Sequence, residues 1–217
     1  MKPGSLTPIL LLACFGACTS TSTSVRYLAP DLGPVDTVAL LPPTLIWSTG
    51  DEPRSYVEHA LFRELVATHD ALVVLPVHKS RARLAAADLA EVYEQLPVRR
   101  SSTGVLDSAT VVELCTGLGV QRLLFAKVVH YEDINPDEPD TPCSVRLEAE
   151  LWDGRTGRIG WHAVTTAETF PQDLGSGVTL FSCQEGGIDL VDAAVRDFAK
   201  TFLTPHRGKG RDPNRGR

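Results

Sequence analysis

The sequence predicts an α/β fold: a single domain in which amphipathic helices pack on a mixed β-sheet, with an α+β arrangement as the alternative. Three observations support this prediction. Short apolar runs typical of buried strands alternate with helical patterns in the first half of the chain, longer strands in succession follow, and an amphipathic helix comes last. The expected order is β-α-β-α-α-β-β-β-α, without a repeat. The chain has 217 residues, 43% hydrophobic and 22% charged, which is ordinary for a globular domain.

Strands and helices alternate in the first half. The apolar runs 37–41 (TVALL) and 71–75 (ALVVL) each stop at proline, as buried strands do. Between them, 54–69 carries one apolar stripe at helical spacing. A strand, a helix and a strand in about 40 residues favour a parallel βαβ unit. Two more helices are then expected, at 86–96 and 108–118, separated by a loop that begins with PVRRSSTG.

The second half predicts three strands and a helix. Residues 122–131 (RLLFAKVVHY) are apolar on both faces, which is typical of a central strand. Residues 144–152 alternate apolar and charged side chains, so one face of this strand is expected to be solvated. The turn DGRTGR then leads into a strand at 159–170. Apolar residues 3 and 4 apart between Ile188 and Phe202 predict the final helix.

The N-terminal stretch LLLACFGACTSTSTS (10–24) places two cysteines at the end of a short apolar run. The run Leu6–Ala17 is too short to span a membrane and follows Lys2, as in a secretory leader. A metal site would need two further ligands, which no second Cys or His pair supplies. An ordinary signal peptidase site is an alternative, because small residues precede Cys18. The pattern also resembles the bacterial lipoprotein signal, in which a cysteine is acylated and becomes the new N-terminus.

We predict acylation at Cys18, which follows the longer apolar run and precedes Thr-Ser, with Cys14 as the alternative. Three acyl chains would then hold the protein on a membrane. The resemblance implies the outer membrane, because the aspartate that signals inner-membrane retention is absent after either cysteine. The expected division of the chain is a lipoprotein signal peptide at 1–18, a flexible tether at 19–35, a periplasmic α/β domain at 36–204 and a basic disordered tail at 205–217.

Charge is unevenly distributed. The tail contains five Lys/Arg against one aspartate, whereas residues 1–204 contain 16 basic and 26 acidic residues. An acidic body repels phosphates, which argues against nucleic acid as a partner. The basic tail could instead touch an anionic surface.

The sequence offers no catalytic residue, metal site or cofactor motif that rises above ordinary expectation. Glu148 and Glu150 could act as paired carboxylates, with Lys127 on the neighbouring strand, but their alternation with apolar residues predicts a solvated strand face. The acidic loop at 132–140 lacks the spacing of an EF-hand. The histidines form no HExxH pair, and phosphate-binding glycine motifs are absent from the sequence.

Two further groups are candidates for structural or binding roles. In an oxidising periplasm Cys143 and Cys183 could form a disulfide, while Cys115, on an apolar helix face, is expected to be a buried thiol. The loop residues Leu45, Ile46 and Trp47 are candidates for contact with a partner, because exposed aromatic residues often anchor interfaces. The alternative is that they pack over the core.

The segments TVALLP, ALVVLP, LGVQRLLFAKVVHY and LWDGRTGRIGW, with a final amphipathic helix, resemble the group of envelope lipoprotein domains related to the TolB N-terminal domain. This group includes the curli-secretion lipoprotein and the lipoprotein activators of penicillin-binding proteins. The resemblance implies contact with an unidentified envelope protein rather than catalysis. The alternatives are a periplasmic ligand-binding protein or hydrolase-like enzyme that uses Glu148 and Glu150, and a structural envelope tether. The sequence leaves the oligomeric state open.

Overall fold

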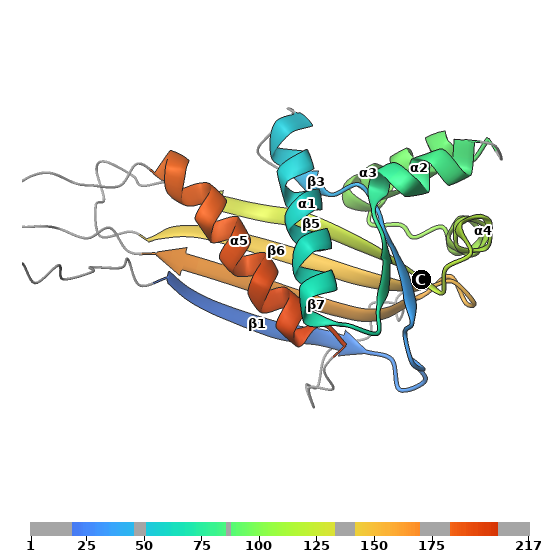
Figure 1. Cartoon of the computed structure of the whole chain (residues 1–217), viewed down its shortest axis with the longest axis horizontal. Helices are drawn as coiled ribbons and strands as arrows, with labels where there is room; N and C mark the ends of the chain where they lie inside the picture. The colour runs from blue at the N-terminus through green and yellow to red at the C-terminus, as the bar shows by residue number, and fades with distance from the viewer. Residues whose placement is uncertain (1–18, 46–50, 86–87, 133–141, 170–182, 204–217) are drawn as a thin grey trace, which may run out of the picture.

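A computed structural model describes residues 19–45, 51–85, 88–132, 142–169 and 183–203 (Figure 1). It contains one sheet with helices on both faces, as predicted. In chain order the elements are β1 (Thr19–Leu28), β2 (Thr37–Leu40), β3 (Thr44–Leu45), α1 (Asp51–Thr68), β4 (Val73–Leu75), α2 (Val77–Ala85), α3 (Ala90–Thr103), α4 (Ser108–Leu118), β5 (Arg122–Glu132), β6 (Cys143–Asp153), β7 (Ile159–Thr169) and α5 (Cys183–Thr201).

The sheet is mixed, and its strand order is β1-β7-β6-β5-β2-β4, with the short β3 also paired to β5. The strands β2, β3 and β4 run parallel to their neighbours, whereas β5, β6, β7 and β1 form an antiparallel meander. The predicted parallel βαβ unit is therefore confirmed as β2-α1-β4. The predicted central strand is β5, which lies between β2 and β6.

The predicted tether is wrong for residues 19–28, because these residues form β1. This strand pairs antiparallel with β7 from Thr19↔Thr169 to Leu28↔Trp161. Its threonines and serines alternate between the two faces, and Thr23 on the inner face bonds to Thr165 of β7 at 2.9 Å. Thr23 also donates to Asp197 of α5 at 2.6 Å. A Ser/Thr-rich composition suggested a solvated linker, but β7 supplies backbone partners and α5 supplies a side-chain partner.

Three other differences concern short or interrupted elements. The strand β3 and the helix α2 lack a clear signal in the sequence. The expected loop PVRRSSTG is wrong for residues 97–103, because α3 continues through Pro97 and ends at Gly104, whose φ is 65°. The final helix, expected from Ile188, begins earlier, at Cys183. By contrast, α4 has the predicted bounds, and Asp107 caps it by accepting a hydrogen bond from the backbone N–H of Thr110.

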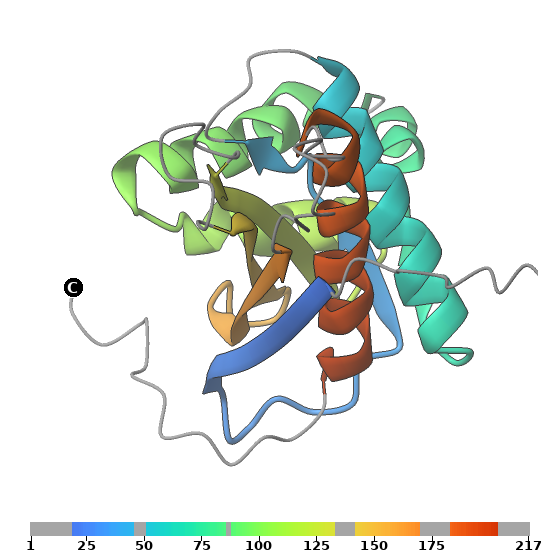
Figure 2. The same cartoon turned by 90° about the vertical axis from the view of Figure 1, so that its left-hand side faces the viewer.

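The helices cover the two faces of the sheet unequally. The helices α1 and α5 lie across one face, as Figures 1 and 2 show, and α5 covers β1, β6 and β7. The helices α3 and α4 cover only part of the opposite face, near the ends of β6 and β5. That opposite face carries exposed Arg146 and His130 where no described helix lies over it.

The hairpin between β6 and β7 is a structural turn, as its sequence predicts. Asp153 Oδ1 accepts hydrogen bonds from the backbone N–H groups of Arg155 and Thr156, at 2.7 and 3.3 Å. Gly157 has a φ of 66°, and a Cβ there would lie 2.1 Å from the Ser108 carbonyl oxygen at the start of α4. The glycine is therefore required both for the turn and for the contact between the hairpin and α4.

Candidate functional site

The two glutamates of β6 have different surroundings, which corrects the prediction that both face solvent. Glu150 is only 5% exposed. Arg100 of α3 lies over it and donates from Nε to Oε2 at 3.0 Å and from Nη2 to Oε1 at 2.7 Å. Trp152 Nε1 adds a third hydrogen bond to Oε2, at 3.0 Å. Glu150 therefore fixes α3 on the sheet.

Glu148 is partly exposed and belongs to a second polar pair. Its Oε1 lies 2.8 Å from Nε2 of His162 on β7, and Lys127 is its register neighbour on β5. The hydrogen bond from His162 lowers the pKa of Glu148, in opposition to burial, and the positive charges of Lys127 and Arg146 lower it further. The predicted closeness of Lys127 and Glu148 on neighbouring strands is confirmed by the register.

These two carboxylates do not form an acid–base pair. Acid–base work by two carboxylates needs surroundings that keep one protonated near neutral pH and leave both accessible to a substrate. The pKa of Glu148 is lowered, so that this group is a carboxylate at neutral pH. Glu150 accepts three hydrogen bonds beneath α3. The arrangement supports attachment of a helix to the sheet.

Sequence reasoning missed Arg100 as a buried partner. Arg100 follows Pro97 in the segment expected to be a loop, where an arginine is usually solvated. Burial lowers the pKa of its guanidinium, but the hydrogen bonds and the charge of Glu150 outweigh this effect and raise it. The one local signal for a longer helix was Gly104 as a C-terminal stop, whereas Pro97 favoured a loop.

Cys143 and Cys115, two cysteines in the described part of the chain, are in different chemical states. Cys143, at the start of β6, is 2% exposed and forms a disulfide. Cys115 of α4 is free and buried, as predicted, and burial raises its pKa to about 12. The side chain of Cys183 lies outside the described residues, as do Cys14 and Cys18, so that the predicted pairing and the acylation site remain predictions.

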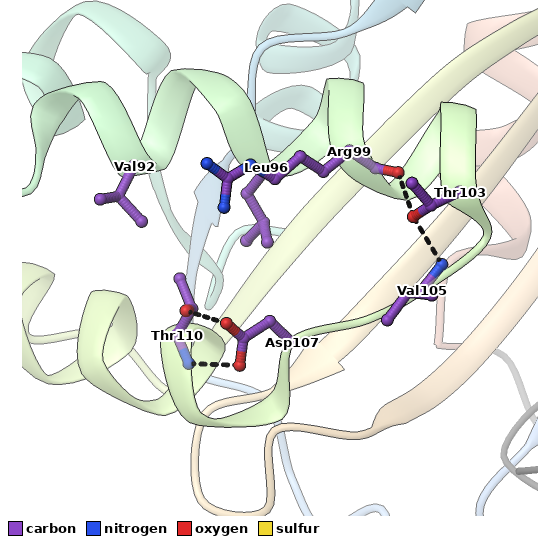
Figure 3. A pocket seen from close by; sticks show the side chains of 7 residues that line it. All are labelled: Val92, Leu96, Arg99, Thr103, Val105, Asp107 and Thr110. Carbon is purple, nitrogen blue, oxygen red and sulfur yellow. Dashed lines mark hydrogen bonds between the residues drawn. The ribbon is translucent and has the colours of Figure 1, made fainter.

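Of the three candidate contact residues, Leu45 forms part of β3 and packs half-buried against the core. Ile46 and Trp47 lie outside the described residues. A different surface is hollowed: a groove of about 260 Å³ lies between α3 and α4 (Figure 3). We call it the α3–α4 groove, and its lining residues are Val92, Leu96, Arg99, Thr103, Val105, Asp107 and Thr110.

The α3–α4 groove combines an apolar floor with one basic and one acidic side chain. Leu96 points from α3 into the gap, and Asp107 and Thr110 line it from the start of α4 (Figure 3). Val105 is 51% exposed and so presents apolar surface at the groove. Hydrogen bonds from the Thr110 hydroxyl and backbone lower the pKa of Asp107. The groove thus offers apolar contact area next to separate positive and negative charges.

Within the described part of the chain, no group of three or more His, Cys, Asp or Glu side chains could hold a metal ion. Within the same residues, no helix is both long and apolar enough to cross a membrane.

No family model matches the chain, and no curated protein matches it either. Solved structures that are similar include the PelC dodecamer from Paraburkholderia phytofirmans, with 14% identity, 84% of this chain and 98% of that chain covered, and a TM-score of 0.46. Lipoprotein GNA1162 from Neisseria meningitidis is 17% identical, with 65% of this chain and 89% of that chain covered and a TM-score of 0.38. The LpoB C-terminal domain from Salmonella enterica is 13% identical, with 64% of this chain and 86% of that chain covered and a TM-score of 0.34.

Proposed function

We propose that this chain is a lipoprotein of the bacterial outer membrane whose domain faces the periplasm and binds a protein partner of the cell envelope. The observation that carries the proposal is the leader: a short apolar run ends in Cys18, and the folded domain follows. Acyl chains on Cys18, with Cys14 as the alternative, would attach the protein to the membrane. The disulfide at Cys143 supports an oxidising compartment such as the periplasm.

The α3–α4 groove is the described surface that best suits a protein partner. It is apolar at its centre, where Val105 is exposed, and charged at its sides, where Arg99 and Asp107 lie. This composition matches the apolar core and polar rim of transient interfaces. The buried ion pair of Arg100 and Glu150 attaches α3 to β6, and Arg100 is the chain neighbour of Arg99 in the groove, which favours a preformed surface.

In-cell photo-cross-linking tests the partner. A photoreactive residue at Val105 is expected to give one adduct of reproducible mass, containing an envelope protein. The same residue at Val66 of α1, which is 45% exposed, serves as the matched control and is expected to give none. Absence of an adduct at Val105, or the same products from both positions, would contradict binding at the α3–α4 groove.

Acylation is tested separately with Cys18→Ala and Cys14→Ala. The Cys18→Ala variant is expected to retain its leader and to lack the lipid in its intact mass, because lipoprotein processing requires the acylated cysteine. The Cys14→Ala variant is expected to have the mass of the native mature protein. If Cys18→Ala still loses its leader, the proposed anchor at Cys18 is wrong.

A further inference from the structure

The first strand begins immediately after the proposed anchor. Thr19 is the first residue of β1 and follows Cys18 directly. Consecutive Cα atoms are about 3.8 Å apart, so that acylation at Cys18 leaves no spacer between the lipid and the sheet. The headgroup layer on each side of a bilayer is roughly 5–8 Å thick. The start of β1 must then lie at the headgroups.

The strand β1 is held along its length, and therefore cannot act as a tether. Nine of its residues have register partners on β7. On its inner face, Thr23 bonds both to Thr165 of β7 and to Asp197 of α5, the helix that covers β1 and β7 on this face. Releasing β1 would break these hydrogen bonds and uncover β7. The orientation of the sheet therefore follows the orientation of β1.

One end of the sheet gathers around the start of β1. The register places Thr19 beside Thr169, the last residue of β7, and Thr169 beside Cys143, the first residue of β6. Figure 1 shows that α5 also starts at this end, on the left of the view. We call this the anchor end, and its described strand residues are Thr19, Ser20, Cys143, Ser144, Glu168 and Thr169.

The α3–α4 groove lies far from the anchor end. Arg100, next to the groove, contacts Glu150, which is seven residues along β6 from Cys143. At about 3.4 Å per strand residue this distance is roughly 24 Å. The start of α4, which lines the groove, touches the β6–β7 hairpin at the opposite end of the sheet. Figure 1 shows α2, α3 and α4 on the side away from the start of β1.

We propose that the anchor end rests directly on the phospholipid headgroups. In this orientation β1 holds the sheet rigidly, so that the α3–α4 groove faces the periplasm at a fixed distance from the membrane. This inference rests on the proposed acylation at Cys18. The covalent lipid, rather than charge, holds the contact, since the exposed members of these six residues are the uncharged Thr19 and Ser20, and the acidic Glu168 is half-buried. The position is therefore expected to be insensitive to salt.

Depth-dependent fluorescence quenching tests this orientation. The acylated full-length protein is reconstituted in vesicles of phosphatidylethanolamine and phosphatidylglycerol that carry a nitroxide on the headgroup. A thiol-reactive fluorophore is placed by Ser20→Cys, Ser22→Cys or Ser24→Cys, all exposed positions on one face of β1. Val105→Cys in the groove is the matched control. Labelling is selective, because Cys115 is buried with a pKa raised to about 12 and Cys143 is disulfide-bonded.

The expected result is a loss of fluorescence that is largest at Ser20, smaller at Ser22 and Ser24, and absent at Val105, at both low and high salt. A Gly-Ser spacer of about ten residues inserted before Thr19 has an end-to-end distance of roughly 17 Å and is expected to abolish the gradient. Equal quenching at Ser20 and Val105, or none at either, in a protein whose mass shows acylation at Cys18 would overturn the orientation alone. A mass without acylation at Cys18 would overturn the proposed anchor as well.

Discussion

The two faces of the sheet are covered by helices that use different chemistry. On one face, α5 packs aromatic and aliphatic side chains on β7, with the rings of Trp161, Phe198 and Phe202 in mutual contact at 5.4–5.7 Å between centroids. On the opposite face, α3 is attached by the ion pair of Arg100 and Glu150, at 2.7 Å. Phe125 and Trp152 pack beside that pair.

Both faces bury apolar side chains, but only the α3 face adds a buried bidentate ion pair to them. Apolar contact is not directional, so that the α5 face gains free energy from area buried. A bidentate ion pair gains less net free energy, because both charges lose their hydration, but it permits only one geometry. The α3–α4 groove lies on the second face, where an exact placement of α3 matters most to a partner. The predictions below concern this comparison.

The largest effect is expected from Phe198→Ala in α5. Phe198 is 1% exposed and contacts two aromatic rings, so that its removal leaves a cavity in the main core. Replacing a buried phenylalanine with alanine lowers the free energy of unfolding by about 3–5 kcal/mol. Urea unfolding measures the change. Val66→Ala, at a side chain 45% exposed on α1, is the control and is expected to change stability little. A small effect of Phe198→Ala would mean that the α5 face is not the dominant core.

A somewhat smaller loss of unfolding free energy, about 3 kcal/mol, is expected from Arg100→Met, because this change leaves the buried carboxylate of Glu150 without its positive partner. The double variant Arg100→Met/Glu150→Leu is expected to recover most of that loss, since it removes the uncompensated charge. It should nevertheless weaken cross-linking at Val105, because α3 loses its fixed position. The exposed Arg99→Met is the matched control for stability. Recovery of stability together with full cross-linking would contradict a positioning role for the ion pair.

Thr23→Val is expected to lower the free energy of unfolding by about 1–2 kcal/mol. The change removes the hydrogen bonds from β1 to Thr165 and Asp197 but keeps a side chain that favours a strand. Hydrogen exchange of the β1 amides is expected to increase in this variant before that of β6. Thr21→Val, on the same face but exposed, is the control. If Thr23→Val and Thr21→Val have the same stability and the same exchange rates in β1, the strand is held by its backbone hydrogen bonds alone.

The smallest effect concerns pH. The hydrogen bond from His162 lowers the pKa of Glu148 from its ordinary value of 4.5. Because the folded-state pKa is the lower one, this stabilisation is fully present above the unfolded value and is lost as the pH falls through the folded value. The difference in unfolding free energy between the native protein and His162→Phe is therefore expected to shrink below about pH 4.5. Exposed His59→Phe is the control, and an undiminished difference in acid would contradict the assignment.

Local patterns predicted most of the fold correctly. The unit β2-α1-β4, the central β5, the β6–β7 hairpin and the caps of α4 each follow from apolar runs, proline stops or turn residues that lie within the element. The structure confirms them because tertiary contacts reinforce these local preferences. Cys115 is likewise buried where its helix face indicates.

The errors occur where distant residues decide the structure. The stretch TSTSTS becomes a strand because Thr23 meets Asp197, 174 residues further along the chain. Glu150 is buried because Arg100 lies over it, 50 residues earlier. Neither contact has a signal in the local sequence, and Pro97 favoured a loop at the very place where α3 continues. The α3–α4 groove depends on that continuation and could not be predicted.

The most direct test of the account is intact mass spectrometry of the protein extracted from bacterial membranes with detergent. The account predicts a chain that begins at Cys18, with the added mass of a diacylglycerol and a third acyl chain, and with Cys143 in a disulfide, which we propose to be with Cys183. A chain that begins at Cys18 or later without lipid, or one that retains residues 1–17, would contradict the central claim that the sheet starts at a membrane anchor.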